Sequence, residues 1–372
     1  MPSGLAGAVL DIDLEAIAAN WLSLKSRLKP GAACAAVVKA DAYGLGAARV
    51  APRLEAAGCR HFFVATADEA LALRPLLPAS ALYVLAGVDD RSAGPLAEAS
   101  ILPVLNHAGQ IEAWAREAKR RGHVLPAALH LDSGMNRLGL AREEVSRLAA
   151  EPLPFDGLAI RVLMSHLVSS EVSGNPLNER QRLRFEEAAA RLMPRLGQPQ
   201  LSFANSSGIF LGPAYHYDLA RPGVALYGVN PTPDAPNPMA EVVRLTAKIL
   251  QVRRVDRGET VGYGATARLT RPSRVAVIPI GYADGLPRSA SNRASARIGG
   301  ISVPVIGRVS MDLITLDVTD VPDALAVPGA TVSLIGDGQS IEALAEAAGT
   351  IPYEILTSLG ARYERRYHEA TP

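Results

Sequence analysis

The sequence predicts an α/β protein, a (β/α)8 TIM-like barrel followed by a smaller, mainly antiparallel β domain. Between residues 31 and 230, short apolar runs alternate with amphipathic helical stretches, about eight times in all. A proline-rich segment at 230–238 then interrupts the chain, and short β-branched runs follow it. Because periodicity does not fix strand order, a doubly wound open sheet is the competing architecture for the first part.

The apolar runs have the length and the two-sided apolar character of strands buried in a parallel sheet. In chain order they are residues 32–39, 61–66, 81–87, 101–106, 126–132, 158–166, 200–205 and the segment around 224–228. The helical stretches between them include residues 47–58, 67–77, 110–122 and 178–193.

The two ends of the chain extend this pattern. Residues 8–13 form one more strand candidate than a barrel needs, and Asp13 is suited to cap a helix over 14–28. After residue 238, glycine, proline and aspartate separate β-branched runs, and we expect the chain to finish with helical segments.

Composition excludes several functional classes. The 372 residues carry a net charge of +1 and are 48% hydrophobic, which argues against disorder and against nucleic acid as a main partner. No apolar run approaches the ~18 residues of a membrane span, and we expect no secretory signal. The only two cysteines, Cys34 and Cys59, lack metal-ligand spacing. We therefore expect a cytoplasmic enzyme without a metal site.

Polar residues stand at the ends of the apolar runs, where the active-site loops of a barrel begin. They are Lys39, Asp132 with Arg137 beyond it, His166, Asn205 followed by Ser206, and Arg221 leading into the last run. Each has an ordinary structural interpretation, such as a solvated lysine, a core histidine or a serine helix cap. Together they suit a site that binds anions and reacts with carbonyl groups.

A lysine that burial keeps neutral can react with an aldehyde, and exposed N–H groups at a Ser-Ser-Gly turn can bind phosphate. Pyridoxal 5'-phosphate combines an aldehyde, a phosphate and an electron sink in one cofactor. The residues therefore favour this cofactor.

Seven segments resemble the alanine racemases in order, over essentially the whole chain. They are AVVKADAYGLG (36–46), LDSGMNRLG (131–139), ARPGVALYG (220–228), VGYGATA (261–267), IGYADGLPR (280–288), GRVSMD (307–312) and IPYEILTSL (351–359).

The resemblance implies a pyridoxal-phosphate enzyme of fold type III that interconverts L- and D-alanine, for the cell wall or for breakdown of D-alanine. It divides the chain into an N-terminal strand (1–13) that joins the β domain, a cofactor-binding barrel (14–235) and a C-terminal β-rich domain (236–372). It also implies a head-to-tail homodimer in which each active site takes residues from both chains.

The resemblance assigns a catalytic role to four residues. Lys39 would hold the cofactor as an aldimine and act as base on one face of the substrate α-carbon. Tyr263 of the partner chain would be the base on the other face. A tyrosine has an ordinary pKa near 10, so it needs help to act as a base. The resemblance implies a hydrogen-bonded chain of tyrosine, histidine and arginine, in which the latter two would be His166 and Arg221. Arg221 would also face the pyridine nitrogen and leave it unprotonated.

The remaining assignments concern binding. Arg137 would contact the phenolic oxygen of the cofactor and the substrate. The other cofactor-binding residues would be Tyr43, Asn205, Ser206, Gly223, Val224 and Tyr353. Met311 and Asp312, from the partner chain, would meet the substrate carboxylate.

Two positions depart from the family pattern. A lysine that is carbamylated in many members is His130 here, so another group or an anion must hold Arg137. A histidine that supports the pyridine-side arginine is Ser202 here.

Three alternatives remain open at this point. A racemase of broader range, acting for example on serine, would use the same scaffold. A fold-type-III decarboxylase would have a carboxylate in place of Arg221, and a carrier of pyridoxal phosphate would not need Tyr263.

Overall fold

The structure is a computed structural model that describes residues 7–150 and 155–369. The chain divides into two compact units. One unit is Ile17–Ala240, and the other combines the residues up to Ala16 with those from Glu241 onward. The division at Ala16 falls inside helix α1 (Leu14–Ser26), whose N-terminus is capped as predicted. The carboxylate of Asp13 accepts the N–H of Ala16 at 2.8 Å.

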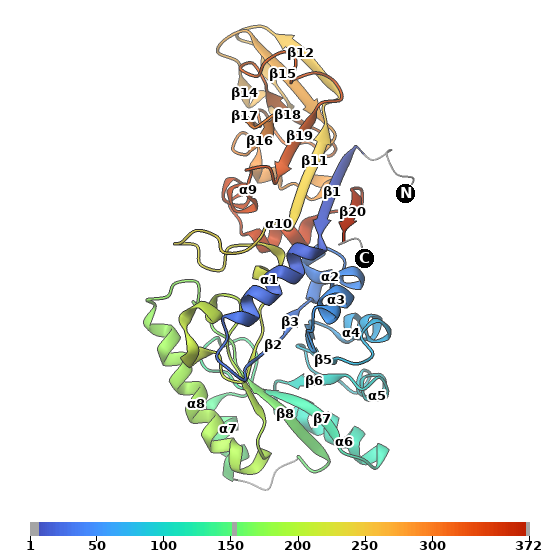
Figure 1. Cartoon of the computed structure of the whole chain (residues 1–372), viewed down its shortest axis with the longest axis vertical. Coiled ribbons are helices and arrows are strands. Elements are labelled where there is room, and N and C mark those ends of the chain that lie inside the picture. The colour runs from blue at the N-terminus through green and yellow to red at the C-terminus, as the bar shows by residue number, and fades with distance from the viewer. Residues whose placement is uncertain (1–6, 151–154, 370–372) are drawn as a thin grey trace. The chain divides into compact units, whose positions relative to one another are not determined.

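The unit Ile17–Ala240 contains the predicted barrel of parallel strands (Figure 1). Seven strands form one sheet in chain order: β3 (Ala36–Val37), β4 (His61–Val64), β5 (Ala81–Val84), β6 (Leu102–Leu105), β7 (Leu125–His130), β8 (Leu158–Met164) and β9 (Gln200–Ser202). Strand β10 (Leu219–Ala220) pairs in parallel with β2 (Ala33–Cys34).

Backbone hydrogen bonds close the ring between β9 and β10. The N–H groups of Asp218 and Arg221 donate to the carbonyls of Leu201 and Ala204 at 2.9 and 2.8 Å. The strand preceding Lys39 therefore joins β4 on one side and β10 on the other, and the open-sheet alternative is wrong.

Helices flank the strands on the outside of this ring (Figure 1). They are α3 (Ala47–Ala56), α4 (Ala67–Leu73), α5 (Ala93–Glu98), α6 (Ala108–Arg121), α7 (Arg142–Ala150) and α8 (Pro176–Leu196). Each has buried apolar side chains. Trp114 of α6, for example, is fully buried and donates its indole N–H to the carbonyl of Pro126 in β7 at 3.2 Å.

The expected strand around 224–228 is wrong. Residues Val224–Tyr227 form a short 3-10 helix, η4, and the eighth strand is β10, which ends just before Arg221. The segment is apolar because all four of its side chains are buried. The phenol of Tyr227 donates to the carbonyl of Val37 at 2.9 Å, so η4 packs onto the end of β3 instead of extending the sheet.

The other unit is the predicted β-rich domain. Its larger sheet has the order β17 (Ile301–Pro304), β16 (Ser295–Ile298), β19 (Thr331–Ile335), β11 (Val243–Lys248), β1 (Ala8–Asp13) and β20 (Glu364–His368). A second sheet has the order β12 (Gln251–Val255), β15 (Ser273–Ile278) and β18 (Ile314–Asp317), and β13 (Thr260–Val261) pairs with β14 (Ala267–Arg268).

Strand β1 lies inside the larger sheet and alternates buried and half-buried side chains. It runs antiparallel to β11, with Leu10 opposite Leu245, and parallel to β20, with Leu10 opposite Arg365. Alternation of this kind is typical of a strand with one face on a core.

The expectation of a helical end to the chain is only partly correct. Helices α9 (Ile341–Ala348) and α10 (Pro352–Ser358) are present, but the described chain continues into strand β20. Its residues, ERRYH, are mostly charged and lack an apolar alternation, so the sequence pattern does not predict this strand, which lies at a sheet edge. No described helix has the length and apolar character needed to span a membrane.

Candidate active site

The predicted barrel residues gather where the parallel strands end. Lys39 follows β3, Arg137 lies in the loop after β7, His166 follows β8, Asn205 and Ser206 follow β9, and Arg221, Gly223 and Val224 follow β10. The carboxyl ends of parallel barrel strands meet at one mouth, which is where such folds place their chemistry.

Lys39 begins a turn with an unusual backbone. The four residues Ala40–Tyr43 all have positive φ, between 53° and 55°, which is a left-handed conformation that costs about 1 kcal/mol or more per residue. Side chains hold the turn in place: Glu69 accepts the N–H of Ala40 at 2.7 Å, and Asp41 accepts the N–H of Ala47 at 2.7 Å. These hydrogen bonds maintain the strained turn that follows Lys39 at the barrel mouth.

The environment of Lys39 favours a neutral amine. Burial lowers the pKa of its ammonium group, the positive charge of Arg137 lowers it further, and Glu69 opposes the shift. A larger neutral fraction makes the amine a better nucleophile for an aldehyde.

Arg221 is a buried cation with fixed hydrogen bonds. Its side chain is only 4% exposed, one Nη donates to the carbonyl of Ser165 at 2.6 Å, and the other donates to the hydroxyl of Ser202. That hydroxyl in turn donates to the carbonyl of Leu219 at 2.5 Å. Burial lowers the pKa of Arg221 to about 9, which leaves it charged at neutral pH. Ser202, the second departure from the family pattern, therefore orients the arginine itself.

Two histidines near Arg221 are held neutral. Burial, followed by the charges of Arg221 and Arg137, lowers the pKa of His166 to about 3. Burial and the charge of Arg221 lower the pKa of His130 to about 4. No hydrogen bond among the described residues joins the ring of His166 to Arg221, so the expected link between them is electrostatic in this chain.

The tautomer of His130 follows from its partner. Asn106 uses its amide nitrogen to donate to the carbonyls of Leu85 and Val104, at 3.1 and 2.8 Å. Its Oδ1 is therefore the atom that faces Nδ1 of His130, at 2.8 Å, and this assigns the proton to Nδ1. The Nε2 atom of the neutral ring remains an acceptor.

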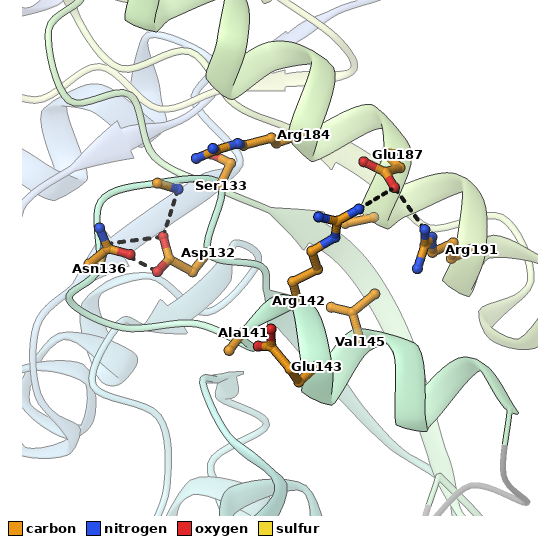
Figure 2. A pocket seen from close by; sticks show the side chains of 12 residues that line it. Asp132, Ser133, Asn136, Ala141, Arg142, Glu143, Val145, Arg184, Glu187 and Arg191 are labelled. Carbon is orange, nitrogen blue, oxygen red and sulfur yellow. Dashed lines mark hydrogen bonds and ion pairs between the residues drawn. The ribbon is translucent and has the colours of Figure 1, made fainter.

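The loop that carries Arg137 is closed by Asp132. Its carboxylate accepts the N–H groups of Gly134 and Met135, each at 2.9 Å. It also accepts the N–H of Asn136, as Figure 2 shows. Gly139, with φ of +105°, allows the end of the loop to pack closely against its start, because a Cβ there would lie 2.8 Å from the amide nitrogen of Asp132. Arg137 is exposed and forms no ion pair or hydrogen bond with another described residue.

A cavity of about 360 Å³ lies behind this loop, between α7 and α8. Figure 2 shows that Glu187 of α8 joins the two helices, since it pairs with Arg142 of α7 at 3.4 Å. Glu187 also pairs with Arg191 of its own helix at 2.7 Å. The cavity therefore has a balanced set of charges and belongs to the support of the loop.

A compact turn suited to phosphate follows β9 and β10. The hydroxyl of Ser206 accepts the N–H groups of Gly223 and Ala225 at 3.0 and 3.3 Å, which leaves its own proton available. A Cβ at Gly223 would lie only 2.4 Å from the hydroxyl oxygen of Tyr43, so glycine allows that hydroxyl to enter the turn. Asn205 supports the turn, because its Oδ1 accepts from Ser170 and Gly208, each at 2.8 Å. These groups fit a bound phosphate.

The remaining predicted residues belong to the β-rich unit, and all four are exposed. Tyr263 lies in η5 (Tyr263–Ala265) and is 73% exposed. Met311 and Asp312 lie in the turn before β18, and Tyr353 lies in the first turn of α10.

The prediction missed two residues that orient the others. Asn106 ends the fourth apolar run, so the rule that selected Lys39 and His166 could have selected it as well. Ser165 acts through its backbone carbonyl, for which a sequence carries no signal. Among the described residues, no group of three His, Cys, Asp or Glu side chains could hold a metal ion.

Comparison with known proteins agrees with this geometry. The alanine racemase N-terminal domain matches residues 12–231, and the alanine racemase C-terminal domain matches residues 242–367. The chain belongs to the alanine racemase family. Members of this family are pyridoxal-phosphate-dependent isomerases.

Individual relatives cover nearly the whole chain. The alanine racemase of Rhodospirillum rubrum is 54% identical over 97% of this chain and 96% of its own length, and a catabolic alanine racemase of Mesorhizobium japonicum is 48% identical over 97% and 93%. The crystal structure of the Bartonella henselae enzyme, with covalently bound pyridoxal phosphate, is 42% identical with a TM-score of 0.93 and covers 98% of this chain and 100% of that one.

The neutral histidines predict an acid-sensitive fold. A histidine with an ordinary pKa of 6.5 and a folded value of about 4 binds fewer protons when folded, so the free energy of unfolding falls as the pH decreases from 6.5 towards 4. Urea denaturation should show that His130→Gln reduces this fall by about 2 kcal/mol. His123→Gln, at an exposed position, is the matched control. An unchanged pH dependence in His130→Gln would contradict the burial of a neutral ring.

Proposed function

We propose that the chain interconverts L- and D-alanine with pyridoxal 5'-phosphate. The observation that supports this most directly is Lys39, a lysine of lowered pKa at a barrel mouth that also contains a glycine-lined phosphate turn. The Bartonella henselae relative carries the same cofactor covalently bound.

The residues that would hold the cofactor follow from the site. Lys39 would bind its carbonyl carbon. Ser206, the backbone of Gly223 and Val224, and the hydroxyl groups of Tyr43 and Tyr353 would bind its phosphate, with Asn205 supporting the turn. Arg137 would contact its phenolic oxygen and the substrate.

When bound, the cofactor supplies an electron sink for the substrate α-carbon. Arg221 would face its pyridine nitrogen, and a guanidinium group cannot accept the proton there at neutral pH. The decarboxylase alternative needs a carboxylate at this place, whereas Arg221 is held by the neutral oxygens of Ser165 and Ser202. This arrangement favours return of a proton to the α-carbon and therefore racemisation.

Two bases on opposite faces of the α-carbon would exchange the proton. Lys39, whose pKa is lowered, would remove or return it on one face. Tyr263 of a partner chain would act on the other face, which its exposure permits. His166 is neutral and keeps one ring N–H, which it would donate to the phenolate of Tyr263 and so favour its ionisation.

The assembly implied by this mechanism is a homodimer with composite active sites, in which Met311 and Asp312 of the partner would meet the substrate carboxylate. We propose the cytoplasm as its location, since both cysteines are buried free thiols. The product would be D-alanine for the cell wall. Both biosynthetic and catabolic relatives exist, in Pseudomonas aeruginosa and Mesorhizobium japonicum.

Initial rates on a panel of L-amino acids, with added cofactor, test the substrate. L-alanine should be racemised at least about tenfold more efficiently than L-serine, because a serine hydroxyl in a site without a partner for it costs binding energy. Chiral chromatography of the products measures both rates. Equal rates would support the broader racemase, and release of carbon dioxide would support the decarboxylase.

The assignment of Lys39 can be tested chemically. The protein with its cofactor should be yellow, absorbing near ~420 nm, and borohydride should fix the cofactor to this lysine. Peptide mass spectrometry locates the reduced adduct. An adduct on Lys25, Lys29 or another lysine would show that the assignment is wrong.

Subunit exchange tests the composite site. Lys39→Ala and Tyr263→Phe should each be nearly inactive, since each removes one base. After mixing and exchange, half of the dimers are mixed and each contains one intact site, so about a quarter of wild-type activity should return. Native mass spectrometry confirms the exchange. Absence of recovery in exchanged dimers would show that Lys39 and Tyr263 do not meet across an interface.

A further inference from the structure

In the β-rich unit, Arg362 joins two acidic residues through all three nitrogens of its guanidinium group. Its Nε and one Nη donate to the two carboxylate oxygens of Asp284, at 2.6 and 2.8 Å. Its other Nη donates to the carboxylate of Asp312 at 2.7 Å. Such a forked set of charge-assisted bonds fixes direction as well as distance.

Asp284 anchors the arginine to a buried turn. Its side chain is 5% exposed and lies in η6 (Tyr282–Asp284), where it accepts the N–H of Gly281 at 2.9 Å. The arginine itself is half-exposed. Arg362 therefore has one fixed partner in the interior and one partner at the surface.

The same turn is bonded to the residues beside Asp312. The N–H groups of Tyr282 and Ala283 donate to the carbonyls of Ser310 and Met311, each at 3.0 Å. A Cβ at Gly281 would lie 2.3 Å from the carbonyl oxygen of Met311, so only glycine permits this approach. These contacts hold the 281–285 turn and the 310–313 turn together.

The 310–313 turn leaves two donors available. The hydroxyl of Ser310 bonds to both the carbonyl and the N–H of Leu313, at 2.6 and 3.2 Å, and closes the turn. Among the described residues, none accepts the N–H of Met311 or of Asp312. Two adjacent free amides on a fixed turn suit an anion.

The carboxylate of Asp312 makes such an anion site unfavourable on its own. A substrate carboxylate that approaches the Met311 amide would also approach Asp312, and two like charges at short distance repel each other. The guanidinium of Arg362 offsets the charge of Asp312 and directs its carboxylate.

We propose that Arg362 is a positioning residue for the substrate carboxylate: through Asp284 and Asp312 it fixes the 310–313 turn and neutralises Asp312. The inference rests on the proposed function, which brings the substrate to Met311 and Asp312. The contacts that support it lie within one unit of the chain.

The decisive experiment compares ligands with and without a carboxylate. In Arg362→Met, KM for L- and D-alanine should rise about tenfold while kcat stays within about twofold, because a ground-state interaction is lost. Inhibition by propanoate should weaken by a similar factor. Binding of L-alaninamide, followed by the cofactor absorbance, should not change. Arg271→Met, which breaks an exposed pair with Asp320 in the same unit, is the matched control and should change none of these values.

A double variant distinguishes the effect of the Asp312 charge from a general loss of structure. If the loss in Arg362→Met comes from the uncompensated carboxylate, Asp312→Asn added to it should recover part of the affinity for propanoate, whereas independent effects would add. Arg362→Lys, which keeps a cation but not the fork, should lie between the wild type and Arg362→Met. It also serves as the test variant if Arg362→Met does not fold, as judged by circular dichroism.

Hydrogen exchange gives a readout that needs neither cofactor nor turnover. Amides in a peptide covering 308–318 should exchange faster in Arg362→Met than in the wild type or Arg271→Met. A fall in kcat alone, an equal loss for L-alaninamide, or additive effects in the double variant would overturn the inference. If the wild type did not racemise alanine, the proposed function would fail, and propanoate binding by calorimetry would still decide the role of Arg362.

Discussion

The barrel mouth depends on the burial of one charge, that of Arg221. A cation removed from water must be held by hydrogen bonds, and here the carbonyl of Ser165 and the hydroxyl of Ser202 accept them. Both partners are neutral, so the charge is not cancelled and its field reaches the neighbouring groups. That field contributes to the low pKa values of His166 and His130. Burial is the larger cause of both shifts, and the charge of Arg221 adds to it.

The same excess of positive charge defines what the mouth can bind. Lys39, Arg137 and Arg221 lie around it, and the nearest acids are already committed to the backbone. Glu69 accepts the N–H groups of Ala40 and Ala65, each at 2.7 Å, and Asp132 accepts those of its own loop. The three basic groups outnumber these two acids, and the excess of positive charge favours anionic ligands. A phosphate, a phenolate and a substrate carboxylate together match that requirement.

The sequence predicted the barrel, the β-rich domain and the residues at the strand ends, because apolar alternation and strand-end polarity are local properties. It failed where the local pattern and the tertiary structure disagree. Val224–Tyr227 is apolar because it is buried as a turn, and β20 is charged although it pairs with β1. The left-handed turn after Lys39 has no local signal either, since AlaAspAla is an ordinary helical composition. Asn106, Ser165 and Arg362 each act by orienting another residue, and such roles appear only when distances are known.

The histidine at position 130 affects the pKa of Lys39 through Arg137. The family resemblance implies that many members have a carbamylated lysine, which is an anion, beside the arginine equivalent to Arg137. Here the ring at this position is neutral, with its proton on Nδ1 held by Asn106. The charge of Arg137 is therefore not offset from that side, and Arg137 is the second cause, after burial, of the lowered pKa of Lys39. The exchange of an anion for a neutral ring thus shifts Lys39 towards the neutral amine that its proposed role requires. The positive charge that remains on Arg137 also strengthens its attraction for an anionic ligand.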